Sequence, residues 1–295
     1  MKLRRILSIV LLCVLLCTAV PLQGMALHTD DFQVIISMEG LTLGQGFYVT
    51  PTKYTMDEIN ALLAPQGFGP FTKRNLTVAM ATLAMLRDKN LTAHFNARWD
   101  KNIAYLTGVE DIDKGTVNIP AVITQNGGPS NRTVRKNADR SLDEMDYTDQ
   151  SGWMVTVNDF MISDNIAKFG LENNNTPRNK GFQDYGNTYV IRWQFTLWGY
   201  GLDLGFKLPG WDATPYFTHA NKDALYAAYA TGTDADAKAK LLPVMENLTD
   251  AQTEVDAALD AYEHPAQPEP EQLNFFQRLL AFFRNLLHKL FPFIK

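Results

Sequence analysis

The chain has 295 residues, 46% of them hydrophobic, which is enough to bury one large core or two of ordinary size. Its formal net charge of −5 lacks the basic excess that nucleic-acid-binding proteins use, so we expect no nucleic-acid partner. Both cysteines, Cys13 and Cys17, lie in the N-terminal segment. Residues 27–295 therefore contain no disulfide, thiol nucleophile or cysteine metal ligand.

Residues 1–26 have the pattern of a secretory signal peptide. Lys2, Arg4 and Arg5 precede an apolar run over residues 6–20, and small residues end at Ala26. The apolar run is too short to span a bilayer. Cleavage after Ala26 removes three basic residues and leaves 24 basic against 32 acidic ones, a formal net charge of −8. We therefore predict an exported protein.

The absence of cysteine from the mature chain fits a bacterial envelope or cell surface better than a eukaryotic secretory product. Four Asn-x-Thr sequons keep the eukaryotic alternative open, at Asn75, Asn90, Asn131 and Asn247.

The first half of the mature chain predicts a β-hairpin followed by two helices. Residues 33–39 and 47–54 have the composition of strands, and the glycines around residues 44–46 predict the turn between them. Residues 56–63 carry acidic residues near the start and a proline after the end, which favours a helix. Residues 78–87, rich in Ala, Met and Leu, predict a second helix.

The middle of the chain is less regular. Residues 94–108 show helical spacing of apolar residues without a firm cap, and residues 111–140 are polar and loop-like. Residues 151–158 and 189–196 then alternate as strands do. In the second strand Arg192 and Gln194 fall on one face and Trp193 on the other, so we expect one buried face and one solvent-exposed face.

Aromatic residues in and after these two strands are the candidate ligand-binding residues. The alternative is that each ring belongs to the hydrophobic core. The Gly-rich turn of the first hairpin shapes a loop beside them. The candidate set is Trp153, Trp193, Trp198, Tyr200, Gly44, Gln45 and Gly46.

Four segments together resemble a bacterial exported domain of unknown function that is similar to the C-terminal domain of transcobalamin: residues 39–47, 119–120, 151–158 and 190–196. The resemblance covers about residues 32–206 and implies an α+β fold, with a β-grasp-like antiparallel or mixed sheet and helices. In the transcobalamin relatives this domain covers one face of a corrinoid, held against a larger helical domain. A corrinoid-like small molecule is thus one candidate ligand. This sequence differs in a polar insertion over residues 173–188 and has no counterpart of that helical domain.

The remaining chain predicts three segments. Residues 207–263 form a small helical region in which Asn221 caps one helix and a Thr249-x-x-Gln252 capping box starts another. We expect this region to pack on a neighbour and not to form a site. Residues 264–271 are a Pro-rich linker, and residues 272–295 predict a basic amphipathic helix.

That terminal segment predicts contact with a membrane surface. Its apolar residues recur at helical spacing, its charged residues are all basic, and it is too interrupted by charge to span a bilayer. Docking onto the protein, or self-association, is the alternative. The candidate membrane-contact residues are Phe276, Leu279, Leu280, Phe283, Leu287, Leu290, Arg278, Arg284 and Lys289.

Motifs for catalysis are missing from the sequence. The histidines have no metal-ligand spacing, and neither a Gly-x-Ser-x-Gly elbow nor a phosphate-binding loop occurs. We expect no metal, no cofactor and no enzymatic activity, with a hydrolase using paired carboxylates as a weaker alternative. The leading hypothesis is an exported, envelope-associated binding or adhesion protein. The alternative is a structural module of a surface assembly without a small ligand.

Overall fold

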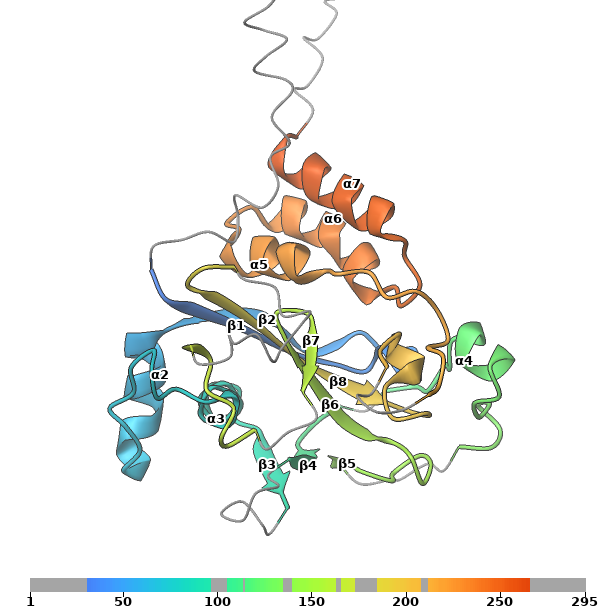
Figure 1. The fold of residues 1–295 in the computed structure, drawn as a ribbon, viewed down its shortest axis with the longest axis horizontal. Helices are drawn as coiled ribbons and strands as arrows, with labels where there is room; N and C mark the ends of the chain where they lie inside the picture. Colours follow the sequence, from blue (N-terminus) through green and yellow to red (C-terminus); the bar gives the residue numbers. More distant parts are fainter. Residues whose placement is uncertain are drawn as a thin grey trace, which may run out of the picture.

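The computed structural model describes residues 31–96, 105–113, 115–134, 140–162, 166–172, 185–207 and 212–265. These residues form an α+β structure around a mixed five-stranded sheet, with helices on both faces (Figure 1). The predicted α+β class is confirmed at this level.

The five-stranded sheet has the order β2-β1-β8-β6-β7. Its central pair, β1 and β8, is parallel, and each of the other neighbouring pairs is antiparallel. The sheet therefore joins the first strand of the described chain to the last, which lie about 150 residues apart in sequence. The strands are β1 (Gln33–Glu39), β2 (Phe47–Thr55), β6 (Gly152–Val157), β7 (Phe160–Ile162) and β8 (Thr188–Thr196).

Helices and a second, smaller sheet complete the fold in three layers (Figure 1). One face of the large sheet packs on α2 (Met56–Leu63), α3 (Val78–Asp88) and a three-stranded sheet of β3 (Thr92–Phe95), β4 (Leu106–Glu110) and β5 (Leu142–Asp143). The other face is covered by α5 (Asp223–Thr231), α6 (Ala235–Glu246) and α7 (Gln252–Glu263). The short helix α4 (Ala121–Gln125) and the 3-10 turns η1 (Leu41–Leu43), η2 (Ala64–Gln66) and η4 (Leu202–Leu204) lie in the connections.

The predicted hairpin and the two predicted helices that follow it are confirmed. At α2, Thr55 and Glu58 form a reciprocal capping box, in which the Glu58 carboxylate accepts from the Thr55 main-chain N–H at 2.7 Å. At α3, the Thr77 side chain accepts from the main-chain N–H of Met80. Both helix starts thus depend on local side chains, although the signals that predict the two helices are the acidic start and following proline of α2 and the composition of α3, and these caps were not identified from the sequence.

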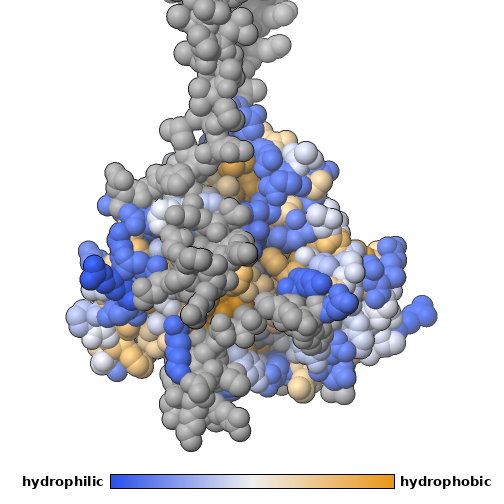
Figure 2. Space-filling model, in the orientation of Figure 1, coloured by the Kyte–Doolittle hydropathy of each residue, from blue (hydrophilic) through white to orange (hydrophobic). Residues whose placement is uncertain are grey.

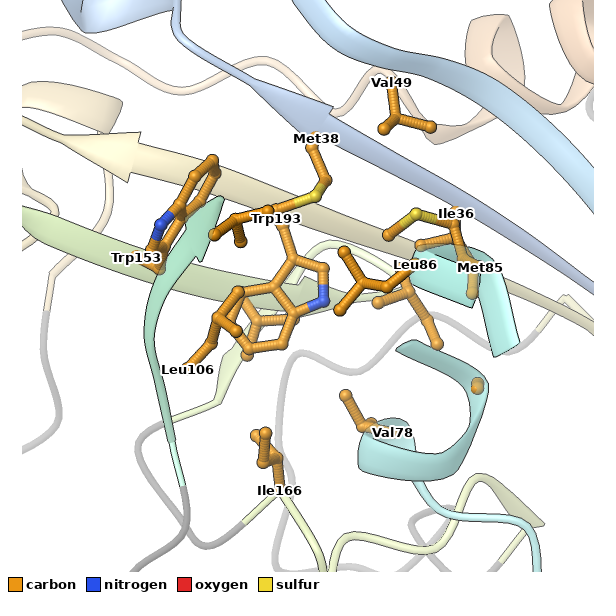
Figure 3. Close-up of a cluster of buried hydrophobic side chains, with 14 of the residues drawn as sticks. Ile36, Met38, Val49, Val78, Met85, Leu86, Leu106, Trp153, Ile166 and Trp193 are labelled. Carbon is orange, nitrogen blue, oxygen red and sulfur yellow. The ribbon is translucent and has the colours of Figure 1, made fainter. Parts of the chain in front are cut away.

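Trp193 lies at the centre of the larger core. Its ring is 1% exposed and lies between Leu86 and Leu106 (Figure 3). Its indole N–H donates to the Thr82 hydroxyl on α3 at 2.9 Å. A large buried ring whose single polar atom is bonded is a core residue.

The structure corrects the prediction that one face of the 189–196 strand is exposed. All nine residues of β8 are buried. Arg192 and Gln194, which alternation placed on the exposed face, are each 2% exposed because α5 covers that face. Strand alternation distinguishes the two faces and does not reveal a helix that arrives later in the chain.

Three further predictions differ from the structure. Residues 94–108 have the apolar spacing of a helix, but the two ends of this range belong to strands β3 and β4. Helix α6 was not predicted. The predicted Thr249 capping box is wrong, because the Thr249 hydroxyl bonds Asn247 and α7 starts three residues later, where Glu254 accepts from the Ala251 main-chain N–H at 2.8 Å.

We predict that Trp193→Ala lowers the free energy of unfolding by about 3–5 kcal/mol, because it removes a fully buried ring and leaves a cavity. Urea denaturation of the mature chain measures this. Met145→Ala is the control, since Met145 is 56% exposed and should shift stability by less than about 0.5 kcal/mol. Equal effects of the two substitutions would contradict the core assignment.

Candidate functional site

Two of the candidate aromatic residues, Trp153 and Trp193, lie in the hydrophobic core. Trp153 is 6% exposed, its indole N–H donates to the Leu142 carbonyl at 2.9 Å, and its ring packs edge-to-face on Phe195. Neither indole presents a face to a ligand in this structure, so their positions match the core alternative.

The other two, Trp198 and Tyr200, lie on the turn that follows β8. Tyr200 has a φ of +52° and stands between Gly199 and Gly201, whose φ values are also positive. A non-glycine residue in the left-handed region is strained, and such strain often accompanies function. The Tyr200 side chain is 39% exposed, whereas Trp198 is half-buried against the core.

A buried carboxylate, Asp203, holds this aromatic turn in place. It accepts hydrogen bonds from the Thr196 hydroxyl at 2.6 Å and from the main-chain N–H groups of Leu197 and Trp198 at 2.7 and 2.9 Å. Burial raises the pKa of Asp203 to about 6, and these hydrogen bonds oppose the shift. The turn is therefore a rigid structure that presents Tyr200 at the surface.

The predicted glycine loop, residues 44–46, is also held in place, and glycine is required at its first position. Gly44 has a φ of +67°, and a Cβ atom there would meet the Asn118 carbonyl. A Cβ atom on Gly46 would meet the carboxylate of Glu246, the last residue of α6. Main-chain bonds from Gly44 to Leu41 and from Asn118 to Leu43 close the loop. Other residues would displace these neighbours.

This loop forms one wall of a pocket of about 400 Å³. The start of α4 forms a second wall, and the connection between α6 and α7 forms the third. Its lining combines apolar and polar side chains. The lining residues are Leu41, Gly44, Gln45, Gly46, Pro120, Ala121, Val122, Glu246, Asn247, Leu248 and Thr249.

Glu246 is the ionisable group of this pocket. Burial raises its pKa, and a hydrogen bond from the Phe47 main-chain N–H opposes that shift. The sequence analysis selected the Gly44–Gly46 side of the pocket and missed Glu246, because an isolated glutamate at a helix end carries no motif.

The glycine loop and the aromatic turn lie at the same end of the large sheet (Figure 1). Strands β1 and β8 run parallel, so the loop after β1 and the turn after β8 lie at the same end of the sheet. The Thr42 hydroxyl, next to the glycine loop, donates to the Phe195 carbonyl near the end of β8 at 2.5 Å. Parallel pairing is what brings these distant segments together.

A buried polar cluster lies beneath α5, on the face of β1 and β8 opposite Trp193. The sequence analysis did not predict it. Arg192 donates to both oxygens of the Glu39 carboxylate, at 3.0 and 2.9 Å, and both side chains are fully buried. The ring of Tyr226 from α5 covers the guanidinium at 4.3 Å. Ser37 and Gln194 bond members of the pair. A cation, a carboxylate and an aromatic ring thus join the sheet to α5.

Asp223, the first residue of α5, is fully buried beside this cluster. Within the described residues neither of its carboxylate oxygens has a hydrogen-bond partner. Burial raises its pKa well above the ordinary value, and the nearby Asp159 carboxylate raises it further, while Arg192 opposes the shift. Its neutral form is therefore favoured in the folded protein.

The candidate membrane-contact residues between Phe276 and Leu290 lie outside the described residues. In the parts of the chain that the structure describes, no helix is both long and apolar enough to cross a membrane. In those same parts no cluster of three or more His, Cys, Asp or Glu side chains has a metal-binding arrangement.

Comparisons of this chain with protein-family models, with curated proteins and with solved structures find no match.

We predict that Asp223→Asn stabilises the protein increasingly as the pH rises. A raised folded pKa contributes stability that is present below the unfolded value of about 4 and lost as the pH rises through the folded value. Each unit of difference corresponds to about 1.4 kcal/mol. Urea unfolding between pH 4 and pH 8 measures the gap between variant and wild type.

Asp236→Asn is the matched control, because Asp236 occupies the first turn of α6 and is exposed. A gap for Asp223→Asn that stays flat with pH, or one that the control reproduces, would contradict the assignment of a destabilised buried carboxylate.

Proposed function

We propose that this protein is an exported, non-enzymatic binding protein whose site is the sheet end formed by the glycine loop and the aromatic turn. The observation that carries the proposal is the placement of the residue 44–46 loop on a pocket of about 400 Å³, at the sheet end where Tyr200 is exposed. Small-molecule sites have volumes of roughly 300–1,000 Å³ and combine apolar walls with a few polar groups.

The lining of this pocket favours a ligand that carries a hydrogen-bond donor beside an apolar body. Leu41, Pro120 and Val122 supply apolar surface, and Glu246 supplies the acceptor. The exposed ring of Tyr200 offers stacking area at the same sheet end. A corrinoid-like molecule, a glycan or a peptide carries both features, and the peripheral amides of a corrinoid are donors of this kind.

We further propose that the domain is β-grasp-like and related to the C-terminal domain of transcobalamin. The supporting observations are a mixed sheet with its first and last strands parallel at the centre, flanked by antiparallel neighbours. Helices α2 and α3 follow the first hairpin and pack on one face of the sheet, as helices do in a β-grasp fold. Residues 32–206 carry the resemblance, and the α5–α7 region is additional to it.

The alternative function is a structural module of a surface assembly. The burial of Trp153 and Trp193 favours it, because two of the four candidate aromatic rings serve the core. The rigid bonding of both loops fits either function. Ligand binding distinguishes them.

We expect at least one member of a panel of cyanocobalamin, oligosaccharides and peptides to bind the mature chain in titration calorimetry. For that ligand, Glu246→Gln should weaken binding by about 10–100-fold, because a hydrogen bond to a charged group contributes roughly 1.5–3 kcal/mol. Tyr200→Ala should also weaken binding, because it removes the stacking area of the exposed ring. Glu172→Gln, at an exposed glutamate, is the control and should bind as wild type does.

An unaltered affinity in both Glu246→Gln and Tyr200→Ala would place the ligand elsewhere. A panel without any binder would favour the structural module.

We also propose that residues 272–295 contact the membrane surface. The segment combines phenylalanines and leucines at helical spacing with Arg278, Arg284, Lys289 and Lys295 and has no acidic residue. Such segments lie in the interface with their cations toward anionic headgroups.

Vesicles containing anionic lipid should therefore co-sediment with residues 27–295 and not with residues 27–270. Raising the salt concentration should weaken this binding, because screening reduces the attraction to the headgroups. Equal co-sedimentation of the two chains would remove the membrane contact from the proposal.

A further inference from the structure

The helical region carries a second, larger cavity on the side that faces away from the sheet. This groove has a volume of about 840 Å³ and lies between α6, α7 and the connection from α5 to α6. We propose that it is the docking site of the chain's own C-terminal segment, residues 272–295, when that segment is not on a membrane.

The groove has an apolar floor and an acidic rim. Leu241, which is buried, lies on the floor, and the half-buried Ala237 and Ala258 line the groove beside it, so the surface has short side chains and is open to large apolar groups. Asp234, Asp236 and Glu263 lie among its lining residues, with Lys240 as the basic residue there. In Figure 2 the part of the molecule where α6 and α7 lie carries apolar surface beside strongly hydrophilic surface. An amphipathic helix with a basic polar side matches both properties.

Charge complementarity extends beyond the rim. Residues 224–265 contain eight acidic residues and two lysines, a formal net charge of −6. Residues 272–295 contain four basic residues and no acidic one, a formal net charge of +4. Attraction between the two segments orients the docking, and burial of the Phe and Leu side chains supplies most of its affinity.

The attachment point of the C-terminal segment favours this groove over other surfaces. Pro265 is itself a lining residue, and six residues separate it from residue 272. A tether of this length reaches about 20 Å at most and gives an effective concentration on the order of millimolar. Helices α6 and α7 have 12 residues each, or about 18 Å, so roughly half of the segment can lie along them.

Docking in the groove and membrane contact exclude each other, because both use the same apolar stripe of residues 272–295. The groove therefore competes with the membrane for the segment and holds it in the absence of lipid.

Cysteine cross-linking tests the docking directly, because residues 27–295 contain no cysteine. Ala237→Cys in the groove is combined with Leu280→Cys, Phe283→Cys or Leu287→Cys in the segment. Ala258→Cys is a second groove position in case the first alters α6. Asn90→Cys, at an exposed turn after α3 on the other face of the sheet, replaces the groove cysteine as the matched control. Each protein is oxidised at low concentration without lipid.

We expect at least one groove pair to form an intramolecular disulfide more than tenfold faster than its Asn90→Cys control. Reversing the rim charges with Asp234→Lys, Asp236→Lys and Glu263→Lys should slow that reaction severalfold, and anionic vesicles should slow it as well. Equal rates for groove and control pairs, or disulfides formed mainly between two molecules, would overturn the docking. Fast cross-linking that anionic vesicles leave unchanged, while they co-sediment with the protein, would overturn the competition.

Discussion

The structure depends on one buried ion pair, Arg192 with Glu39, at the centre of the large sheet. The two residues belong to the parallel strands β8 and β1, and the carboxylate receives two hydrogen bonds from the guanidinium. A buried charge is costly unless it is paired and hydrogen-bonded, and removal of one partner from such a pair costs roughly 3–5 kcal/mol. Tyr226 of α5 shields this pair, so the helices after residue 222 belong to the same folded unit as the sheet.

The pocket beside the glycine loop is a consequence of that packing. Lys222 is buried at the start of α5, and its ammonium donates to the carbonyls of Val244 and Asn247 near the end of α6. Burial lowers its pKa to about 8. This lysine fixes the end of α6 and the α6–α7 connection against α5, and the last residue of α6, Glu246, then lies over Gly46. The candidate site is thus shared between the predicted exported domain and the helical region, although the sequence separates them.

The helical region has two sides with different roles. Its inner side buries a polar sheet face that includes Ser37, Thr156 and Gln194, each at most 2% exposed. Its outer side is acidic and hollowed. Exposed acidic residues are usual on a protein surface, but a cavity that is larger than the candidate ligand pocket and is lined by Pro265, the last residue that the structure describes, is a specific arrangement. The region is therefore more than a spacer, since it shields the ion pair, completes a pocket and carries the groove in which we propose that the C-terminal segment docks.

Local signals determined a large part of the fold. Periodicity and turn residues located β1, β2, β6 and β8. Acidic residues at the start and a proline after the end located α2, and an Ala-, Met- and Leu-rich stretch located α3, because each of these signals depends on neighbours in sequence. Glycine spacing identified the residue 44–46 loop for the same reason.

Only the tertiary structure decided which faces are buried and what surrounds the loops. Alternation in β8 separates Trp193 from Arg192, yet a helix some 30 residues later buries the Arg192 face as well. The roles of Trp153, Glu246 and Asp223 likewise depend on contacts across 11 to 200 residues. Partners at such separations leave no periodic trace, because burial is set by whichever surface arrives to cover a residue.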